Sequence, residues 1–161
     1  MTVKTTLIVL SAALTLAATP ALSQSWETIT LAKDDGIGAN TTNSEGADIL
    51  ISCSADEIPA ITVGLPVMDL TSNVAQDLAL FVDGEELQGV AWGFELNPAG
   101  SGIWLNGDAN AQWHIVRAIS EEIIQGGQLT VMMPSIGFAT NFDLAGARLA
   151  MAPVIASCGL A

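Results

Sequence analysis

The chain contains no tyrosine, one histidine, two cysteines and four basic residues among 161. Most recurrent catalytic and metal-binding sites combine several imidazole or thiol groups, so this scarcity leaves few ways to build one. The four basic residues face 17 acidic ones, which gives a formal net charge of −13. Nucleic acids and anionic membrane surfaces bind basic patches, so the composition predicts neither as a partner.

Hydrophobic residues are plentiful by contrast. They make up half of the chain, and only 13% of the residues are charged. A chain of this length and composition can bury a core, and extensive disorder is not expected. We therefore predict one folded domain.

The N-terminus has the features of an export signal. Lys4 precedes an apolar run over residues 6–18, which ends near Pro20, and small residues stand at 21 and 23. This pattern predicts a signal peptide over residues 1–23, cleaved before Gln24, and a periplasmic or secreted mature chain without a membrane span. An uncleaved anchor is the alternative, but the run is short for a bilayer.

Export determines how the two cysteines are interpreted. In an oxidising compartment, Cys53 and Cys158 are expected to form a disulfide rather than remain as two buried thiols. The bridge would close a loop of about one hundred residues, worth about 4–5 kcal/mol in the chain-entropy account. The chain lacks the further ligands that a two-cysteine metal site would need.

Most of the mature chain has the pattern of short strands separated by turn-forming residues. The expected strands are residues 26–32, 47–54, 58–64, 74–82, 88–96, 103–105, 128–133 and 138–145. Residues 36–46, rich in glycine, asparagine and threonine, are interpreted as a loop. Asp83-Gly84 is typical of a β-hairpin turn.

Two segments have helical character. Ile115, Ile119 and Ile123 recur every four residues and predict a helix over residues 111–125, which Gly126-Gly127 would end. Residues 146–157 predict a short C-terminal helix, interrupted at Pro153. The order of elements favours an antiparallel β-sandwich with one internal helix and a short C-terminal helix, in a single disulfide-stapled domain over residues 24–161.

Several features in sequence order resemble a known group of proteins. These are Trp26, the strand ending at Cys53, the Asp83-Gly84 hairpin, the strand over 127–131, and the Phe-x-Leu-x-Gly segment at 142–146 followed by Cys158. Together they resemble the VasI-like and invasion-associated-locus-B-like small exported bacterial proteins. Met132 and Met133 stand where an arginine is expected in that group. The resemblance implies a small disulfide-bonded β-sandwich without a known catalytic centre.

The candidate site residues offer little chemistry. His114 is the only imidazole and no Gly-x-Ser-x-Gly elbow accompanies it, so we interpret it as a packed or surface residue. Residues 106–110 place oxygen-bearing side chains at the 1-3-5 spacing of a calcium loop. Ala111 replaces the turn glycine, however, and Arg117 occupies the twelfth position. A polar turn that caps the next helix is the preferred interpretation, and a looser calcium site stays open.

Glu85 and Glu86 are adjacent, so on a strand they would point to opposite faces rather than toward one sugar. We interpret them as the solvated tip of a hairpin. The four tryptophans are expected in the core or at sheet edges, with ligand stacking as the alternative: Trp26, Trp92, Trp104 and Trp113.

These observations predict a non-catalytic exported binding or accessory module, without catalytic, metal-binding or cofactor-binding residues. The expected partner is a protein, with a basic patch that complements the acidic chain. Two alternatives stay open: a carrier of a small apolar ligand, and a hydrolase that depends on carboxylates and a metal.

Overall fold

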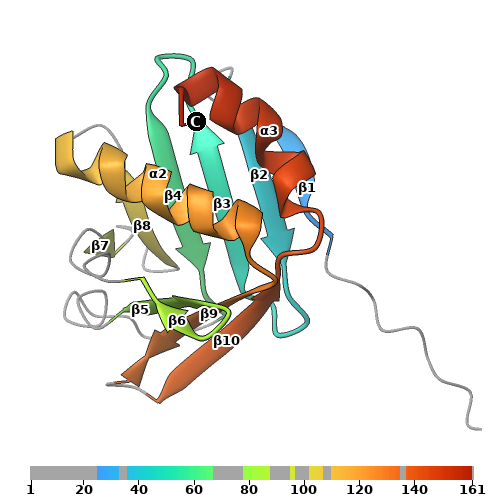
Figure 1. The fold of residues 1–161 in the computed structure, drawn as a ribbon, viewed down its shortest axis with the longest axis vertical. Coiled ribbons are helices and arrows are strands. Elements are labelled where there is room, and N and C mark those ends of the chain that lie inside the picture. The colour runs from blue at the N-terminus through green and yellow to red at the C-terminus, as the bar shows by residue number, and fades with distance from the viewer. Residues whose placement is uncertain are drawn as a thin grey trace, which may run out of the picture.

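The computed structural model describes residues 25–32, 36–66, 78–87, 95–96, 102–106, 110–134 and 137–160. Over these residues the fold is mainly β, with two antiparallel sheets, one internal helix and one C-terminal helix (Figure 1). The predicted fold class is confirmed, and the two sheets are consistent with a β-sandwich. The predicted signal peptide, residues 74–77 of the strand predicted at 74–82, and residues 88–94 of the strand predicted at 88–96 lie outside the described residues.

The larger sheet has six strands and begins as a meander, because each of its first four strands pairs with the next along the chain. In spatial order its strands are β1 (Glu27–Leu31), β2 (Gly36–Thr42), β3 (Asp48–Cys53), β4 (Pro59–Gly64), β8 (Gly102–Asn106) and β7 (Glu95–Leu96). The smaller sheet has four: β10 (Phe138–Asp143), β9 (Gln128–Met133), β5 (Ala79–Val82) and β6 (Glu85–Glu86). The strand β5 turns into β6 at Asp83-Gly84, so the predicted hairpin turn is confirmed, but the return strand is residues 85–86 rather than 88–96, of which residues 95–96 pair in the other sheet.

The predicted loop over residues 36–46 is wrong, because residues 36–42 form β2, an interior strand of the six-stranded sheet. Its glycines serve close packing rather than turning. A Cβ atom on Gly36 would lie 2.5 Å from the carbonyl oxygen of Cys53 on the next strand. Glycine inside a strand often marks such a close approach. The turn itself is confined to residues 43–47.

Both helices lie across one face of the six-stranded sheet (Figure 1). The internal helix α2 (Asn110–Gln125) contacts β4 and β8, and the C-terminal helix α3 (Ala147–Cys158) contacts β1, β2 and β3. The predicted interruption at Pro153 does not occur, since α3 continues through it. Proline removes the hydrogen bond to the carbonyl of Leu149, but both residues are exposed, so water can replace the missing donor.

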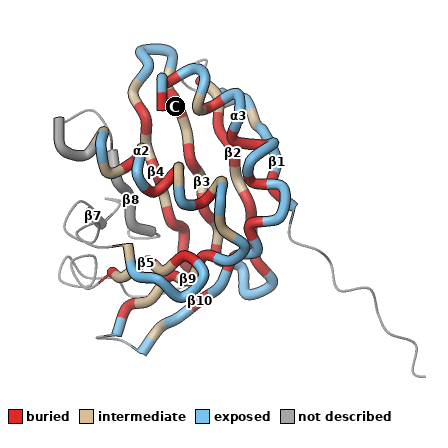
Figure 2. Tube along the Cα trace, viewed as in Figure 1, coloured by how far each residue is buried: buried red, intermediate tan, exposed pale blue. Residues whose placement is uncertain are grey.

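The core forms where the helices cover the six-stranded sheet and where the four-stranded sheet meets it (Figure 2). The helix α2 contributes Val116, Ile119 and Ile123, each 0% exposed, which matches the predicted four-residue repeat. Both sheets contribute fully buried residues, including Ile51, Ile61, Leu80, Val131 and Phe142. One continuous cluster of buried residues therefore joins all layers of the domain.

Candidate functional site

The disulfide predicted between Cys53 and Cys158 is present. The sulfur atoms are 2.10 Å apart and the Cα atoms 5.7 Å apart. The bond joins the last residue of β3 to the last residue of α3, and so fastens the C-terminal helix to an interior strand. It leaves no free cysteine for nucleophilic catalysis. Such a bond fits an oxidising compartment.

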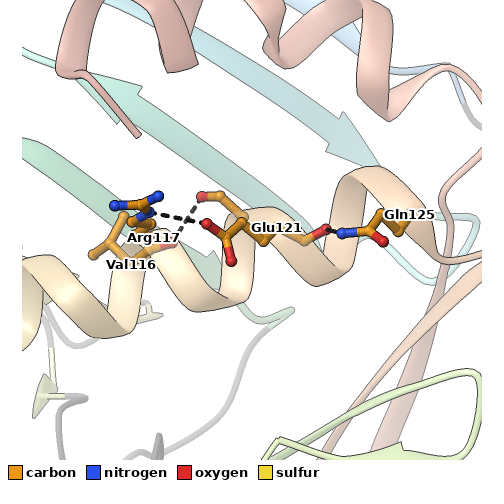
Figure 3. Close-up of polar contacts among 5 residues, drawn as sticks. Val116, Arg117, Glu121 and Gln125 are labelled. Carbon is orange, nitrogen blue, oxygen red and sulfur yellow. Dashed lines mark hydrogen bonds and ion pairs between the residues drawn. The ribbon is translucent and has the colours of Figure 1, made fainter. Parts of the chain in front are cut away.

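His114 lies on the exposed side of α2, within a local surface cluster. Its ring meets Trp113 edge-on with centroids 5.3 Å apart, and the Arg117 guanidinium lies 5.9 Å from the Trp113 ring centre. Arg117 also donates from Nε to Oε1 of Glu121 at 2.9 Å (Figure 3). Exposed pairs of this kind stabilise a helix by about 0.5 kcal/mol. These contacts are those of a surface helix and give His114 no catalytic partner in the described part of the chain.

The other acidic candidates are dispersed. Glu85 and Glu86 form β6, and both are exposed near the tip of the hairpin. In the calcium-like segment, Asn106 ends β8 and Asn110 begins α2, whereas residues 107–109 lie outside the described residues. Among the described residues, no three histidine, cysteine or acidic side chains gather closely enough to hold a metal ion.

The tryptophans that the structure describes take different places. Trp26 is 8% exposed, and its Nε1 donates to the carbonyl oxygen of Asp143 at 2.9 Å, so it packs in the core as expected. Trp113 is half-buried against the core. Trp104 lies opposite Thr62 in the register of β8 and β4, and Trp92 lies outside the described residues.

A feature that the sequence did not reveal is that side chains cover the outer edge of β10. Gln128 lies opposite Asp143 in the pairing of β9 with β10, but its N–H and carbonyl groups both bond to Asp83 instead. The two residues therefore exchange no hydrogen bonds, and the Asp143 carbonyl faces away from β9. Trp26 donates to this carbonyl, and Asn43 Nδ2 donates to the carbonyl of Asn141 at 3.0 Å. Both donors come from the part of the chain that carries the six-stranded sheet. They occupy backbone acceptors that a further strand would need.

The edge at β1 is different. This strand pairs with β2 on one side, and the described residues place no strand on its other side. All five residues of β1 pair with β2, whereas β7, the other edge strand of the six-stranded sheet, has two described residues. The edge strand β6 of the smaller sheet also has two, and both are glutamates. The backbone of β1 is therefore the longest edge in the described structure for which no cap is seen.

An apolar patch adjoins β1 on the sheet face opposite the helices. We define the outer patch as Ile29, Leu31 and Leu50, which are half-buried. They meet over Gly38: a Cβ atom on this glycine would lie 2.9 Å from Leu50 Cδ1, 3.3 Å from Ile29 Cγ1 and 3.5 Å from Leu31 Cδ2. The absence of a side chain at Gly38 lets residues from β1 and β3 come together across β2.

A pocket of about 490 Å³ lies beside the outer patch, at the end of β1. Its described lining consists of Leu31, Ser52, Ser54, Ala55, Asp56, Ile58 and Ala60. Most of these residues belong to the turn between β3 and β4 and to the adjoining ends of those strands. On another side of the same turn, a pocket of about 430 Å³ lies against Cys53 and the last turn of α3.

Asp48 is a separate feature of the outer face. Its carboxylate lies over Gly64, the residue opposite it on β4, where a Cβ atom would collide with it. Partial burial raises the pKa of Asp48 above its ordinary value of 3.8, since burial disfavours the charged form. The sequence offers no local signal for this, because the burial depends on the pairing of β3 with β4.

The described helices include none long and apolar enough to cross a membrane. No protein-family model, curated protein or solved structure matches the chain. Within the described residues, the features that offer a binding surface are the edge of β1, the outer patch and the pocket at its end.

Proposed function

We propose that the chain is a non-catalytic exported binding module that takes an extended segment of a protein partner onto the edge of β1. The observation that carries this proposal is the five-residue edge of β1 beside the outer patch, with side chains capping the edge of β10 instead. The lack of a known catalytic centre in the small exported proteins that the chain resembles agrees with a binding or accessory role.

Backbone pairing would supply part of the affinity. Every second residue of an edge strand directs its N–H and carbonyl groups outward, and a segment laid alongside pairs with them. Side chains of that segment on the outer face would contact Ile29 and Leu31. Burial of apolar surface there adds about 25 cal/mol for each Å² removed from water.

The acidity of the chain determines what kind of partner fits. With 17 acidic and four basic residues, the protein attracts a basic surface and repels an acidic one. Exposed charges are screened over about 8–10 Å at physiological salt, so the association should weaken as salt is raised.

The experiment combines crosslinking with a substitution that places a charge in the apolar outer patch. A photo-crosslinking residue at Thr30, an exposed residue of β1, should capture a partner in the producing cells. Ile29→Lys should abolish binding of that partner to the purified protein. Leu149→Lys is the matched control, because Leu149 is 81% exposed on α3, the helix that covers the sheet face opposite the outer patch, and should leave binding unchanged.

Amide hydrogen exchange tests whether the partner binds at β1. On binding, those amides of residues 27–31 that face away from β2 should become protected. A partner that protects other residues and tolerates Ile29→Lys would contradict the proposed site. Turnover of a hydrolase substrate with calcium, magnesium or zinc would contradict the proposed lack of catalysis.

A further inference from the structure

We propose that the 490 Å³ pocket beside Leu31 accepts one lysine or arginine side chain of the bound segment, and so sets specificity for a basic residue at one position. This inference rests on the proposed function, since it concerns a segment that is already paired with β1.

The position of the pocket connects it to the edge strand. Leu31 is the last residue of β1, belongs to the outer patch and also lines the pocket. A segment that runs along β1 and past Leu31 therefore brings its next outer-face side chain beside Leu31, from where a long side chain can extend toward the pocket. In a strand, side chains on one face recur every second residue, so only one position of the segment meets the pocket.

The lining suits a long side chain with a cationic end. Leu31, Ile58 and Ala60 provide apolar walls for the methylene groups. Asp56 is exposed and is the only charged residue in the described lining. Lysine and arginine bury their apolar stems while the charged group stays near water and an anionic partner.

The turn that carries Asp56 is held in place before any ligand binds. Ser54 Oγ accepts a hydrogen bond from the N–H of Ile58 at 3.1 Å, and the Ser54 N–H donates to the Ile58 carbonyl at 3.1 Å. Cys53, the residue before the turn, is fixed by the disulfide. A preorganised pocket loses little conformational entropy on binding, which favours selectivity at this position.

The test is a selection from displayed random eight-residue peptides against the purified, oxidised protein. Peptides that bind wild type but not Ile29→Lys are retained, because they depend on the β1 edge. We expect these peptides to carry lysine or arginine at one fixed position among strand-forming residues. Selection is repeated against Asp56→Asn and against Glu122→Gln, a matched loss of charge at an exposed residue of α2.

Synthetic peptides then separate the charge from the stem. A selected lysine peptide should bind wild type about 1.4- to fivefold more tightly than its norleucine analogue, the range for one exposed charge pair. The difference should vanish in Asp56→Asn, persist in Glu122→Gln and shrink at high salt.

The outcomes distinguish the two proposals. Peptides that depend on Ile29 but show no basic preference, or a preference that Asp56→Asn leaves intact, overturn the pocket assignment and leave the proposed function standing. No binders at all, or binders indifferent to Ile29→Lys, overturn the proposed function and the pocket assignment together.

Discussion

Asn43 Nδ2 donates a hydrogen bond to Thr140 Oγ1 at 2.5 Å, although the two residues are 97 positions apart in the sequence. Asn43 lies in the turn between β2 and β3, and Thr140 lies in β10 of the smaller sheet. The Thr140 hydroxyl in turn donates to Oε2 of Glu45 at 2.6 Å. Asn43 and Thr140 are 7% and 1% exposed, so a buried polar contact joins the two sheets.

Removing the Thr140 hydroxyl should weaken this junction. Thr140→Val keeps the shape of the side chain but leaves the buried amide of Asn43 without one acceptor. We expect a loss of about 1–3 kcal/mol in the free energy of unfolding, measured with urea. Thr130→Val is the control, because its hydroxyl bonds to Asn141 at the surface and should cost less. Equal losses in the two variants would contradict the role assigned to the buried contact.

The disulfide should contribute strongly to stability. Cys53 and Cys158 are separated by 105 positions, so reduction frees a long loop in the unfolded chain. The variant with serine at both positions should lose about 2–5 kcal/mol of unfolding free energy. Intact-mass and alkylation measurements on the wild type should find no free thiol. Quantitative labelling of both cysteines without a reductant would show that the bridge is absent from the isolated protein.

Asp83 should stabilise the hairpin through its carboxylate oxygens. They accept hydrogen bonds from the N–H groups of Gly127 and Gln128 at 2.9–3.1 Å. Asp83→Ala should lose about 1 kcal/mol or more, because these bonds disappear and alanine is strained at the positive φ of 51°. Asp83→Asn retains one oxygen and tolerates this backbone conformation, so it should recover much of the loss in thermal unfolding. An asparagine variant as unstable as the alanine variant would argue against these bonds.

Asp48 should make stability depend on pH in an unusual direction. Burial raises the pKa of this carboxyl in the folded protein above its ordinary 3.8. The folded state therefore binds a proton more readily than the unfolded state, and Asp48 opposes folding at pH values above its folded pKa. This opposition fades as the pH falls through the folded pKa, and it is absent below 3.8.

Asp48→Asn should accordingly be more stable than wild type at neutral pH, and the advantage should disappear in acid. Urea unfolding at several pH values measures the difference between the two proteins. Glu122→Gln gives the background for an exposed acid. A difference between Asp48→Asn and wild type that stays constant with pH would contradict the raised pKa.

The sequence predicted the elements whose side-chain pattern repeats locally. Alternation in β3 and the four-residue repeat of α2 both come from burial of one face, so Ile51 and Ile119 could be assigned to the core. The strand β2 was missed because its glycines suggested a turn, whereas they allow other residues to approach closely. Local composition does not reveal which neighbour a glycine will meet.

Contacts between distant turns were also beyond prediction. Asp83-Gly84 predicted a hairpin turn and Gly126-Gly127 predicted the end of a helix, but nothing in either segment indicated that Asp83 would accept a hydrogen bond from Gly127. The pocket beside the outer patch likewise depends on contacts between segments that are distant in the sequence. Leu31 and Asp56 line one pocket only because the meander brings the end of β1 to the turn after β3. The disulfide was predictable because the chain offers a single pairing.

The contact between Trp26 and Asp143 spans 117 positions and has a consequence for how the protein is made. The first strand also uses Thr28 to donate to the carbonyl of Ala150, and β3 receives its bridge from Cys158. A chain emerging from the ribosome cannot form these contacts until Asp143, Ala150 and Cys158 have been synthesised. Contacts between such distant residues form slowly. The six-stranded sheet therefore gains its bonds to α3 only after nearly the whole chain has been synthesised.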